Sequence, residues 1–320
     1  MAAPDPFDDV DVSADAGTES QAAAPEASLA QRLRAARRAR ANEKILQEKT
    51  LAERASDRLQ ESQANAYGFL DQAGAFFAFG AHFFARFWRR PFEWKELLKQ
   101  MDEVGSKSFL LTGVTGFAIG IVLSMQSRGT MARFGAEMFL PSMLALSVVK
   151  EIGPVLTSLV LAGRLGAGIG AEIGSMKVSE QIDALEVAAL KPYHYLVVTR
   201  VLACIIMFPI MTAMTDLLAL IGGFIENSFA TGMDYRIFID EAFSSLRFVD
   251  IVVDTMKTSV FGFLVGITSC FLGYTVRGGT REVGQAAMRA VVVSSLLIIL
   301  ADVVIVRISL MLFGDVSEAA

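Results

Sequence analysis

The sequence has few of the residues on which most catalytic and metal sites depend. Among its 320 residues are two cysteines and two histidines, and His82 and His194 stand alone with no metal-ligand spacing around them. Cys204 and Cys270 fall in apolar runs, which indicates small core residues without a disulfide. There is no GxxxxGKS or GxxxxGKT phosphate-binding motif and no nucleophile placed beside a base. We therefore expect no enzyme activity and no cofactor in this chain.

Long apolar runs are what the sequence does contain. Hydrophobic residues make up 53% of the chain, more than a soluble domain usually has. Five runs are long and apolar enough to predict membrane spans, at residues 109–125, 138–174, 196–225, 258–276 and 290–313. The second run is interrupted by charges, and we expect Gly153-Pro154 to kink it. The predicted fold is an all-α integral membrane protein with five transmembrane helices.

Three segments of different character precede the spans. Residues 1–27 are acidic and lack periodicity, which predicts a disordered acidic tail without the features of a signal peptide. Residues 28–65 predict a charged helical extension, whose arginines either attract anionic headgroups or a partner or simply remain solvated. Residues 66–100 combine a helical phenylalanine stripe with clustered Arg and Lys, which favours an amphipathic interfacial helix. The rival interpretation is a first transmembrane span at 67–88.

The distribution of charge between the runs predicts the orientation. The segments before the first run and after the second and fourth runs carry Lys and Arg, whereas the loop after the third is acid-rich. Because cytoplasmic loops of membrane proteins are enriched in Lys and Arg, we expect a cytoplasmic N-terminus and an external C-terminus. Arg128 and Arg133, in the loop after the first run, argue mildly against this orientation.

Small residues and isolated charges occur inside the apolar runs. Glycine or alanine recurs every four residues at 162, 166, 170 and 174, at 116 and 120, and at 262 and 266, a spacing typical of close helix packing in lipid. Ionisable groups at membrane depth usually face a cavity or a partner. In this chain such groups form either a polar collar for a headgroup or ions, or structural ion pairs between helices. They are Lys150, Glu151, Arg164, Asp216, Asp254, Lys257, Asp302 and Arg307.

Residues 175–191 form a charged amphipathic segment between the second and third spans. Val178, Ile182, Leu185 and Ala189 make one apolar stripe at helical spacing, and acidic residues cover the other faces. The segment predicts a short helix on the cytoplasmic side, which either docks a soluble partner or is a plain surface helix between spans.

One long motif resembles a known family. The run KEIGPVLTSLVLAGRLGAGIGAEIGSMKVSEQIDALEV, residues 150–187, is similar to the signature of the MlaE/YrbE permeases, the membrane subunits of ABC-type lipid transporters that work with MCE proteins. The runs GFAIGIVLSMQ at 116–126 and RVLA at 200–203 extend the resemblance. It covers roughly residues 66–313, so that residues 105–315 are expected to form an MlaE-type permease domain.

The resemblance implies a fold and partners that composition does not. It implies an interfacial helix with five spans, a homodimer, a cytoplasmic ABC ATPase dimer that uses ATP and Mg²⁺, and an MCE-domain oligomer on the periplasmic side of the bacterial inner (cytoplasmic) membrane. It implies phospholipid in an outward-open cavity between the two copies, and no nucleic acid as a partner. The positions that it assigns to lipid are Leu123, Gln126, Lys150 and Glu151. The helix that it assigns to ATPase coupling contains Glu172, Lys177, Glu180, Gln181, Asp183 and Glu186.

The expected function is therefore a permease subunit that moves phospholipid, with ATP hydrolysis in the partner moving the coupling helix as a lever. Lys150 stands where many members have Arg; it keeps the charge but cannot make a bidentate contact. Two alternatives remain open: a non-transporting membrane scaffold for a cytoplasmic complex, and an ion-coupled secondary transporter. The latter predicts two repeated halves, which the sequence does not show.

Overall fold

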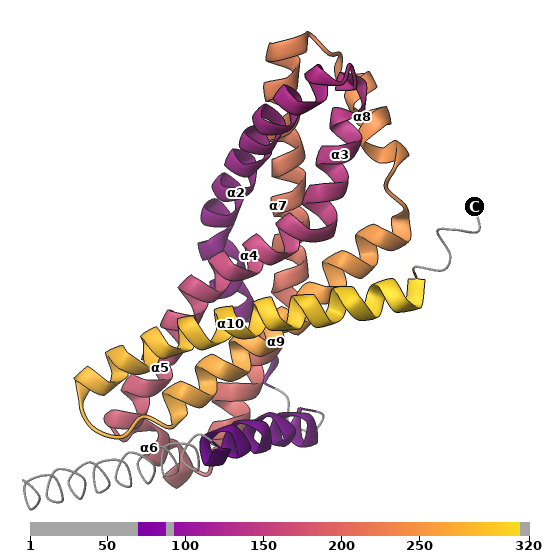
Figure 1. The fold of residues 1–320 in the computed structure, drawn as a ribbon. Helices are drawn as coiled ribbons and strands as arrows, with labels where there is room; N and C mark the ends of the chain where they lie inside the picture. Colours follow the sequence, from indigo (N-terminus) through magenta and orange to yellow (C-terminus); the bar gives the residue numbers. More distant parts are fainter. Residues whose placement is uncertain (1–69, 88–92, 314–320) are drawn as a thin grey trace, which may run out of the picture. The chain divides into compact units, whose positions relative to one another are not determined.

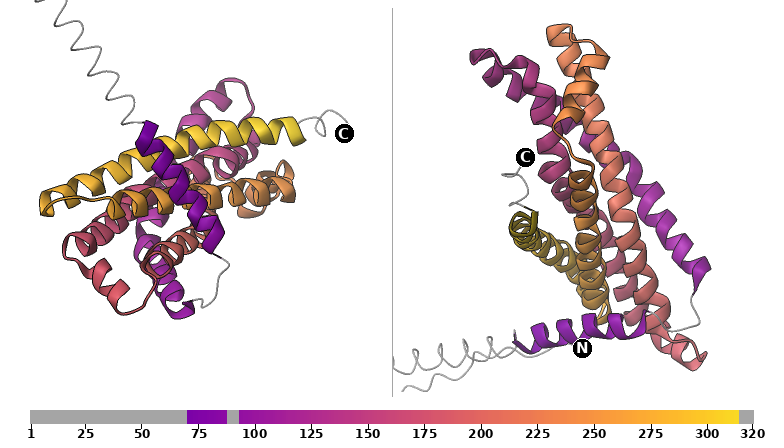
Figure 2. Two further views of the ribbon diagram at one scale, coloured as in Figure 1. Left: turned by 90° about the horizontal axis from the view of Figure 1, so that it is seen from below. Right: turned by 90° about the vertical axis from the view of Figure 1, so that its right-hand side faces the viewer.

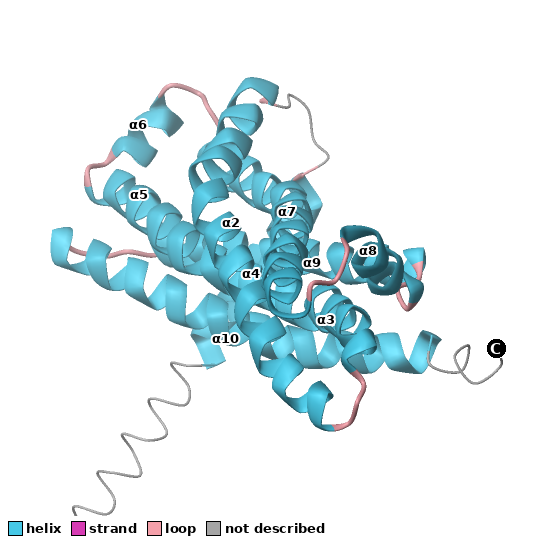
Figure 3. Cartoon of the chain, turned by 90° about the horizontal axis from the view of Figure 1, so that it is seen from above, coloured by secondary structure: helices cyan, strands magenta, loops and turns pink. Residues whose placement is uncertain are grey.

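Helices account for all regular structure in the described part of the chain. The computed structural model describes residues 70–87 and 93–313, and short loops join its helices (Figures 1 and 3). Packing contacts define one unit from Asp71 onward. The acidic tail predicted at 1–27 and the charged extension predicted at 28–65 lie outside the described residues.

Four helical stretches of the described chain are long and apolar enough to cross a membrane. They are Trp94–Arg133, Glu137–Val178, Tyr193–Thr231 and Thr280–Ser309. The first is α2 (Trp94–Arg133), whose 40 residues reach about 60 Å, twice the thickness of a bilayer core. The third contains a π-helical start, η4 (Tyr193–Val198), and α7 (Thr199–Thr231), and the fourth lies in α10 (Thr280–Phe313).

The second stretch is a chain of short helical pieces in place of one regular helix. In order they are η1 (Glu137–Phe139), α3 (Leu140–Ser147), η2 (Val148–Ile152), α4 (Gly153–Leu161), η3 (Ala162–Gly166) and α5 (Ala167–Val178). Both η2 and η3 are π-helical turns. A π-turn inserts a residue into the α-helical ladder, and such turns are frequent at functional sites.

The predicted span at 258–276 corresponds to α9 (Phe248–Tyr274), a 27-residue helix that is not among these four candidate spans. It packs against α7, α5 and α10 and begins with a charged stretch. The loop helix α8 (Tyr235–Ser244) precedes it and packs against α3. An all-helical membrane fold is confirmed, and the count of five spans stays a prediction.

The segment predicted as one interfacial helix at 66–100 contains parts of two helices. One helix occupies residues 70–86, and α2 begins at Trp94, so the last residues of the predicted segment belong to the first long helix. The helix at 70–86 is amphipathic as expected: Phe83 is buried against Phe263, while Phe77 and Phe84 are exposed. The rival interpretation of a span at 67–88 reaches beyond the described residues at both ends and stays untested.

The predicted role of the small residues in helix packing is confirmed. A Cβ added to Gly120 of α2 would lie 1.8 Å from the carbonyl oxygen of Ala219 in α7, and one added to Gly262 of α9 would lie 2.5 Å from that of Cys204. Neither helix pair could pack as closely with a larger side chain, because backbone atoms of one helix contact the other. These contacts fix α7 between α2 and α9.

The two ends of the helical stretches carry different elements. α3 and α8 lie together at one end, and α6 (Gln181–Val187) lies at the other (Figure 1). The helix at 70–86 is at the same end as α6 (Figure 2). By the predicted orientation, the α6 end is cytoplasmic.

Candidate functional site

The first charged pair of the second span is carried by the π-turn η2. Pro154 follows the turn and has no N–H, so the carbonyl of Lys150, four residues earlier, loses its usual helical partner. Lys257 of α9 supplies one: its Nζ donates a hydrogen bond to that carbonyl at 2.6 Å. The expected disturbance at Gly153-Pro154 is therefore a π-turn stabilised from a neighbouring helix.

Lys257 joins three elements in one charge cluster. Its side chain is only 2% exposed, and its Nζ lies 3.2 Å from Oε2 of Glu151 and 3.3 Å from Oδ1 of Asp302 in α10. A buried ammonium is costly unless opposite charges and acceptors surround it. Two carboxylates and a carbonyl do so here, so the cluster cross-links η2, α9 and α10.

Lys150 forms an ion pair outside the Lys257 cluster, with a carboxylate near the start of α9. Its Nζ lies 3.3 Å from Oδ2 of Asp250, which also pairs with Arg247 at 3.4 Å. Asp250 precedes the span predicted at 258–276. Burial opposes its ionisation, but the charges and hydrogen bonds of Lys150 and Arg247 outweigh that effect and hold the pKa of Asp250 below its usual range. Lys150 and Glu151 stay 39% and 47% exposed, so both remain accessible to a ligand.

The two other predicted lipid residues lie on α2. Leu123 is half-buried and packs on the apolar cluster that contains Leu144 and Val148, beside the start of η2. Gln126, three residues later, is exposed. The structure thus brings Leu123 to the same region as the charged π-turn, and no contact within the described residues ties Gln126 to that pair.

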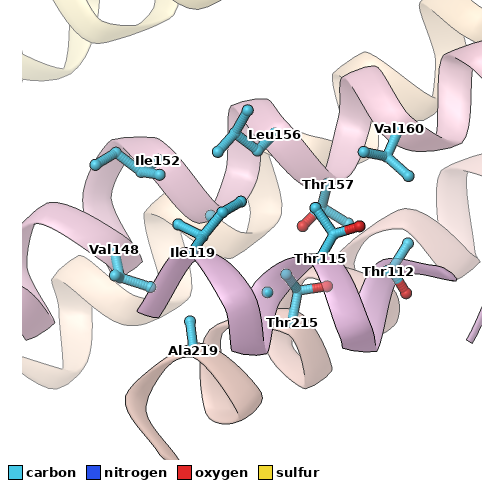
Figure 4. A pocket seen from close by; sticks show the side chains of 12 residues that line it. Thr112, Thr115, Ile119, Val148, Ile152, Leu156, Thr157, Val160, Thr215 and Ala219 are labelled. Atoms are coloured by element: carbon cyan, nitrogen blue, oxygen red, sulfur yellow. The ribbon is translucent and has the colours of Figure 1, made fainter. Parts of the chain in front are cut away.

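A narrow crevice separates α2 from α4 next to this region. Ile119 and Thr115 of α2 face Ile152, Leu156 and the buried hydroxyl of Thr157 across it (Figure 4). Its free volume of about 10 Å³ has room for about one water molecule. An acyl chain does not fit in this crevice.

The predicted coupling residues lie on two helices that meet at a sharp turn. The prediction of one short helix in residues 175–191 is wrong, because α5 ends at Val178 and α6 starts at Gln181. Between them Glu180 has a φ of 58°, a left-handed conformation that non-glycine residues rarely adopt. The turn lets Ile182 bury its side chain completely. Lys177 and Asp183 form an ion pair of 3.1 Å across it.

The remaining coupling residues differ in how firmly they are held. Glu180, Gln181 and Glu186 are exposed. Glu172, by contrast, accepts a hydrogen bond of 2.7 Å from Nη2 of Arg200, which is buried at the start of α7. Glu172 therefore connects the end of the second span to the third, and the exposed residues of α6 remain open to a partner.

Three groups that matter to the geometry were not singled out as site residues from the sequence. Lys257 appears there as an isolated charge and Asp250 belongs to the acid-rich loop after the third run; only the contacts between helices show that Lys257 pairs with Glu151 and Asp250 with Lys150. Nothing in the sequence marks Tyr193 as a contact residue. Its hydroxyl donates a hydrogen bond to the carbonyl of Phe79 at 2.7 Å, and Arg86 lies 5.8 Å from its ring centre. It attaches the helix at 70–86 to the start of the third span.

Four long apolar helical stretches, with charged side chains paired between helices, define a multi-pass membrane protein. The profile of the family described as Permease MlaE matches residues 97–308. The chain therefore belongs to the MlaE permease family, the membrane subunits of ABC transporters, and is not itself the ATPase.

Three relatives agree with this assignment. A probable ABC transporter permease of Rickettsia typhi is 36% identical over 212 residues, which cover 66% of this chain and 82% of the relative. The intermembrane phospholipid transport system permease protein MlaE of Haemophilus influenzae is 32% identical, over 66% and 82% of the two chains. The chloroplastic protein TRIGALACTOSYLDIACYLGLYCEROL 1 of Arabidopsis thaliana is 34% identical, over 66% and 61%.

Proposed function

We propose that this chain is the permease subunit of a phospholipid transporter that moves lipid between the bacterial inner membrane and a periplasmic MCE protein. Family membership and the phospholipid transport named for the Haemophilus relative support the substrate class. The observation that carries the proposal is the half-exposed pair Lys150 and Glu151 on a π-turn, backed by the buried Lys257. Such a pair inside an apolar span is costly unless it serves a polar ligand or a partner.

The proposed lipid site places the headgroup at this pair. The Lys150 ammonium is suited to a phosphate, and Glu151 to a positively charged headgroup. Leu123 provides apolar surface beside η2, and Gln126 a polar group at the end of α2. Because the crevice between α2 and α4 is too small for an acyl chain, the tails lie in a groove completed by a second copy of the chain.

The proposed drive is ATP hydrolysis, with Mg²⁺, in a cytoplasmic ATPase dimer that docks on α6 and the end of α5. The exposed Glu180, Gln181, Asp183 and Glu186 offer it hydrogen-bond acceptors and charge. Movement of this corner is transmitted by Glu172 through Arg200 to the start of α7, and by Lys177 through its bond to Asp183. The chain itself contributes no nucleotide chemistry.

The proposed orientation places α6 and the helix at 70–86 in the cytoplasm and α8 on the periplasmic side, next to the MCE oligomer. The loop between α9 and α10 carries Arg277, and Arg281 lies in the first turn of α10, both on the α6 side of the chain. α8 and its flanks carry Arg236 and Arg247 among the acids Asp234, Asp240 and Glu241. Arg86, Lys95 and Lys99, before the first span, add to the positive charge at the α6 end, and a larger number of Lys and Arg at that end favours a cytoplasmic location.

Native mass spectrometry of the complex purified through this subunit tests the proposal. Two copies of the chain, two ATPase subunits and retained phospholipid are the expected composition. A chain that purifies with neither ATPase nor lipid contradicts it, and favours a scaffold that anchors other proteins.

A further inference from the structure

A polar cavity lies at some distance from the pair Lys150 and Glu151, and it is much larger than the crevice between α2 and α4. It has a volume of about 470 Å³ and is formed between the first turns of α2, the π-turn η3 with α5, and the start of α7. This is within the size range of small-molecule sites in proteins. Arg164, on η3, comes 14 residues after Lys150, which corresponds to about 20 Å of helical rise. The two π-turns of the second span thus each carry a charged residue, at two separate depths.

The walls of this cavity combine both signs of charge with an apolar floor. Arg200 is 3% exposed; its Nη2 donates to Glu172 and its Nη1 to the carbonyl of Leu196 at 3.0 Å, while its Nε has no hydrogen-bond partner within the described chain. Arg164 donates to Ser108 and, at 3.3 Å, to the carbonyl of Glu103. The floor is apolar: Val104, Leu165 and Ile169.

The position of the cavity selects the kind of ligand. Gln100 and Glu103 belong to the first three turns of α2, and Arg200 to the first turn of α7, so the cavity lies toward the α6 end of the chain. α2 packs along α7, whereas α5 packs on α9 and α10, so the cavity lies where two diverging helices leave space. A charged cavity with an apolar floor at the edge of a bilayer suits an amphiphile.

We propose that this cavity binds the headgroup of a zwitterionic phospholipid from the membrane leaflet on the α6 side. The guanidinium groups of Arg164 and Arg200 are donors for its phosphate, since arginine is the side chain best suited to phosphate oxygens. The carboxylates of Glu103 and Glu172 are acceptors for its ammonium. The apolar floor receives the glycerol end of the tails. The inference rests on the proposed function, to which it adds a second lipid site at the opposite end of the same span.

Two glycines of the second span provide a matched pair of variants. Gly168 lines the cavity, and a Cβ added there meets no atom within 4 Å, so a side chain can start there without a backbone clash and Gly168→Leu is expected to occupy the cavity. Gly163 has equally free space but does not line the cavity, and Gly163→Leu is the control. Arg164→Gln removes one proposed phosphate donor as an independent variant.

The experiment uses the full complex in lipid nanodiscs that contain a phosphatidylethanolamine analogue with a photoreactive headgroup. Cross-linked peptides of the wild type should include residues 97–107 and 164–176. Arg164→Gln should lower this labelling about tenfold, the effect of losing a charged hydrogen bond worth about 1.4 kcal/mol. Gly168→Leu should lower it at least as much because the new side chain occupies the cavity, and Gly163→Leu should leave it unchanged. The copy number is measured by native mass spectrometry in the same samples.

Three results overturn the inference. They are absence of these cross-links in the wild type, equal labelling of Gly168→Leu and Gly163→Leu, and loss of the second copy in Gly168→Leu, which would assign the cavity to an interface between copies. Labelling of residues 123–151 in the same digest reports separately on the proposed transport site. Labelling of 123–151 without labelling of 97–107 and 164–176 contradicts the second site alone. The opposite pattern contradicts the proposed transport site alone.

Discussion

The π-turn η2 and the α6-side end of the second span are held in opposite ways. Around η2, the buried Lys257 connects Glu151 to α9 and α10 and satisfies the carbonyl released by Pro154. Beyond η3, the second span ends at a left-handed turn at Glu180, followed by α6 with mostly exposed side chains. The difference indicates that the first region fixes polar groups at one place in the membrane, whereas the second can move with a partner.

Removing the buried ammonium should have the largest effect on this contrast. Lys257→Met leaves the Lys150 carbonyl without a donor and two carboxylates without their cation. Loss of one member of a buried ion pair costs about 3 kcal/mol or more, so we expect a lower thermal unfolding temperature and no lipid transport. Lys177→Met, in the half-exposed pair at the other region, is the control and should unfold almost as the wild type does. Equal unfolding of the two variants would contradict a rigid η2.

Neutralising Glu151 should have a smaller effect, confined to the lipid site. Glu151→Gln keeps the side-chain volume, and Lys257 retains Asp302 and the Lys150 carbonyl as partners. We expect lipid transport to fall about tenfold with ATPase docking unchanged, since one charged contact to a headgroup is worth about 1.4 kcal/mol or more. Transport and ATPase co-purification are measured together, and unchanged transport would remove Glu151 from the proposed site.

Glu180 allows backbone geometry and side-chain charge to be separated. Glycine adopts positive φ without strain, so Glu180→Gly should stabilise the turn by about 1 kcal/mol while it removes the carboxylate. If the carboxylate contacts the ATPase, this variant uncouples ATP hydrolysis from lipid movement although the fold is more stable. Asp183→Asn weakens the ion pair with Lys177 and should also reduce the lipid moved per ATP hydrolysed. Normal coupling in both variants would contradict the lever.

Asp250→Asn should have the smallest effect. It releases Lys150 from a partly exposed ion pair, and such pairs contribute about 1 kcal/mol or less. Because the pKa of Asp250 is lowered in the folded protein, its stabilising contribution is present above its unfolded-state pKa and is lost as the pH falls through the folded value. The acid side of a pH series of unfolding temperatures should therefore be flatter in Asp250→Asn than in the wild type.

The sequence predicts much of the fold because lipid imposes simple rules on it. Apolar run length locates all four candidate spans of the described residues, and the glycine spacing correctly anticipates the close approach of Gly120 and Gly262 to neighbouring backbones. The sequence does not predict where the helix geometry changes. Pro154 indicates an irregularity but not its π-turn, and no local rule places a left-handed residue at Glu180.

The sequence shows which charged residues belong to the candidate site, but not which side chains they contact. Lys150 and Glu151 are visible as charges in an apolar run, but their partners lie about a hundred residues away, at Asp250 and Lys257. Ion pairs between helices depend on packing register, which a single sequence does not contain. For the same reason Asp302, near Arg307 in the sequence, is found beside Lys257.

The most direct test of the account is ATP-driven transfer of labelled phospholipid between proteoliposomes that contain the complete complex and its periplasmic MCE partner, in either direction. We predict ATP-dependent transfer for the wild type, a strong loss for Lys150→Ala with Glu151→Gln, and intact assembly of the variant complex. Absence of transfer by an intact wild-type complex with active ATPase, or full transfer by the double variant, would contradict the claim that this π-turn holds the lipid headgroup.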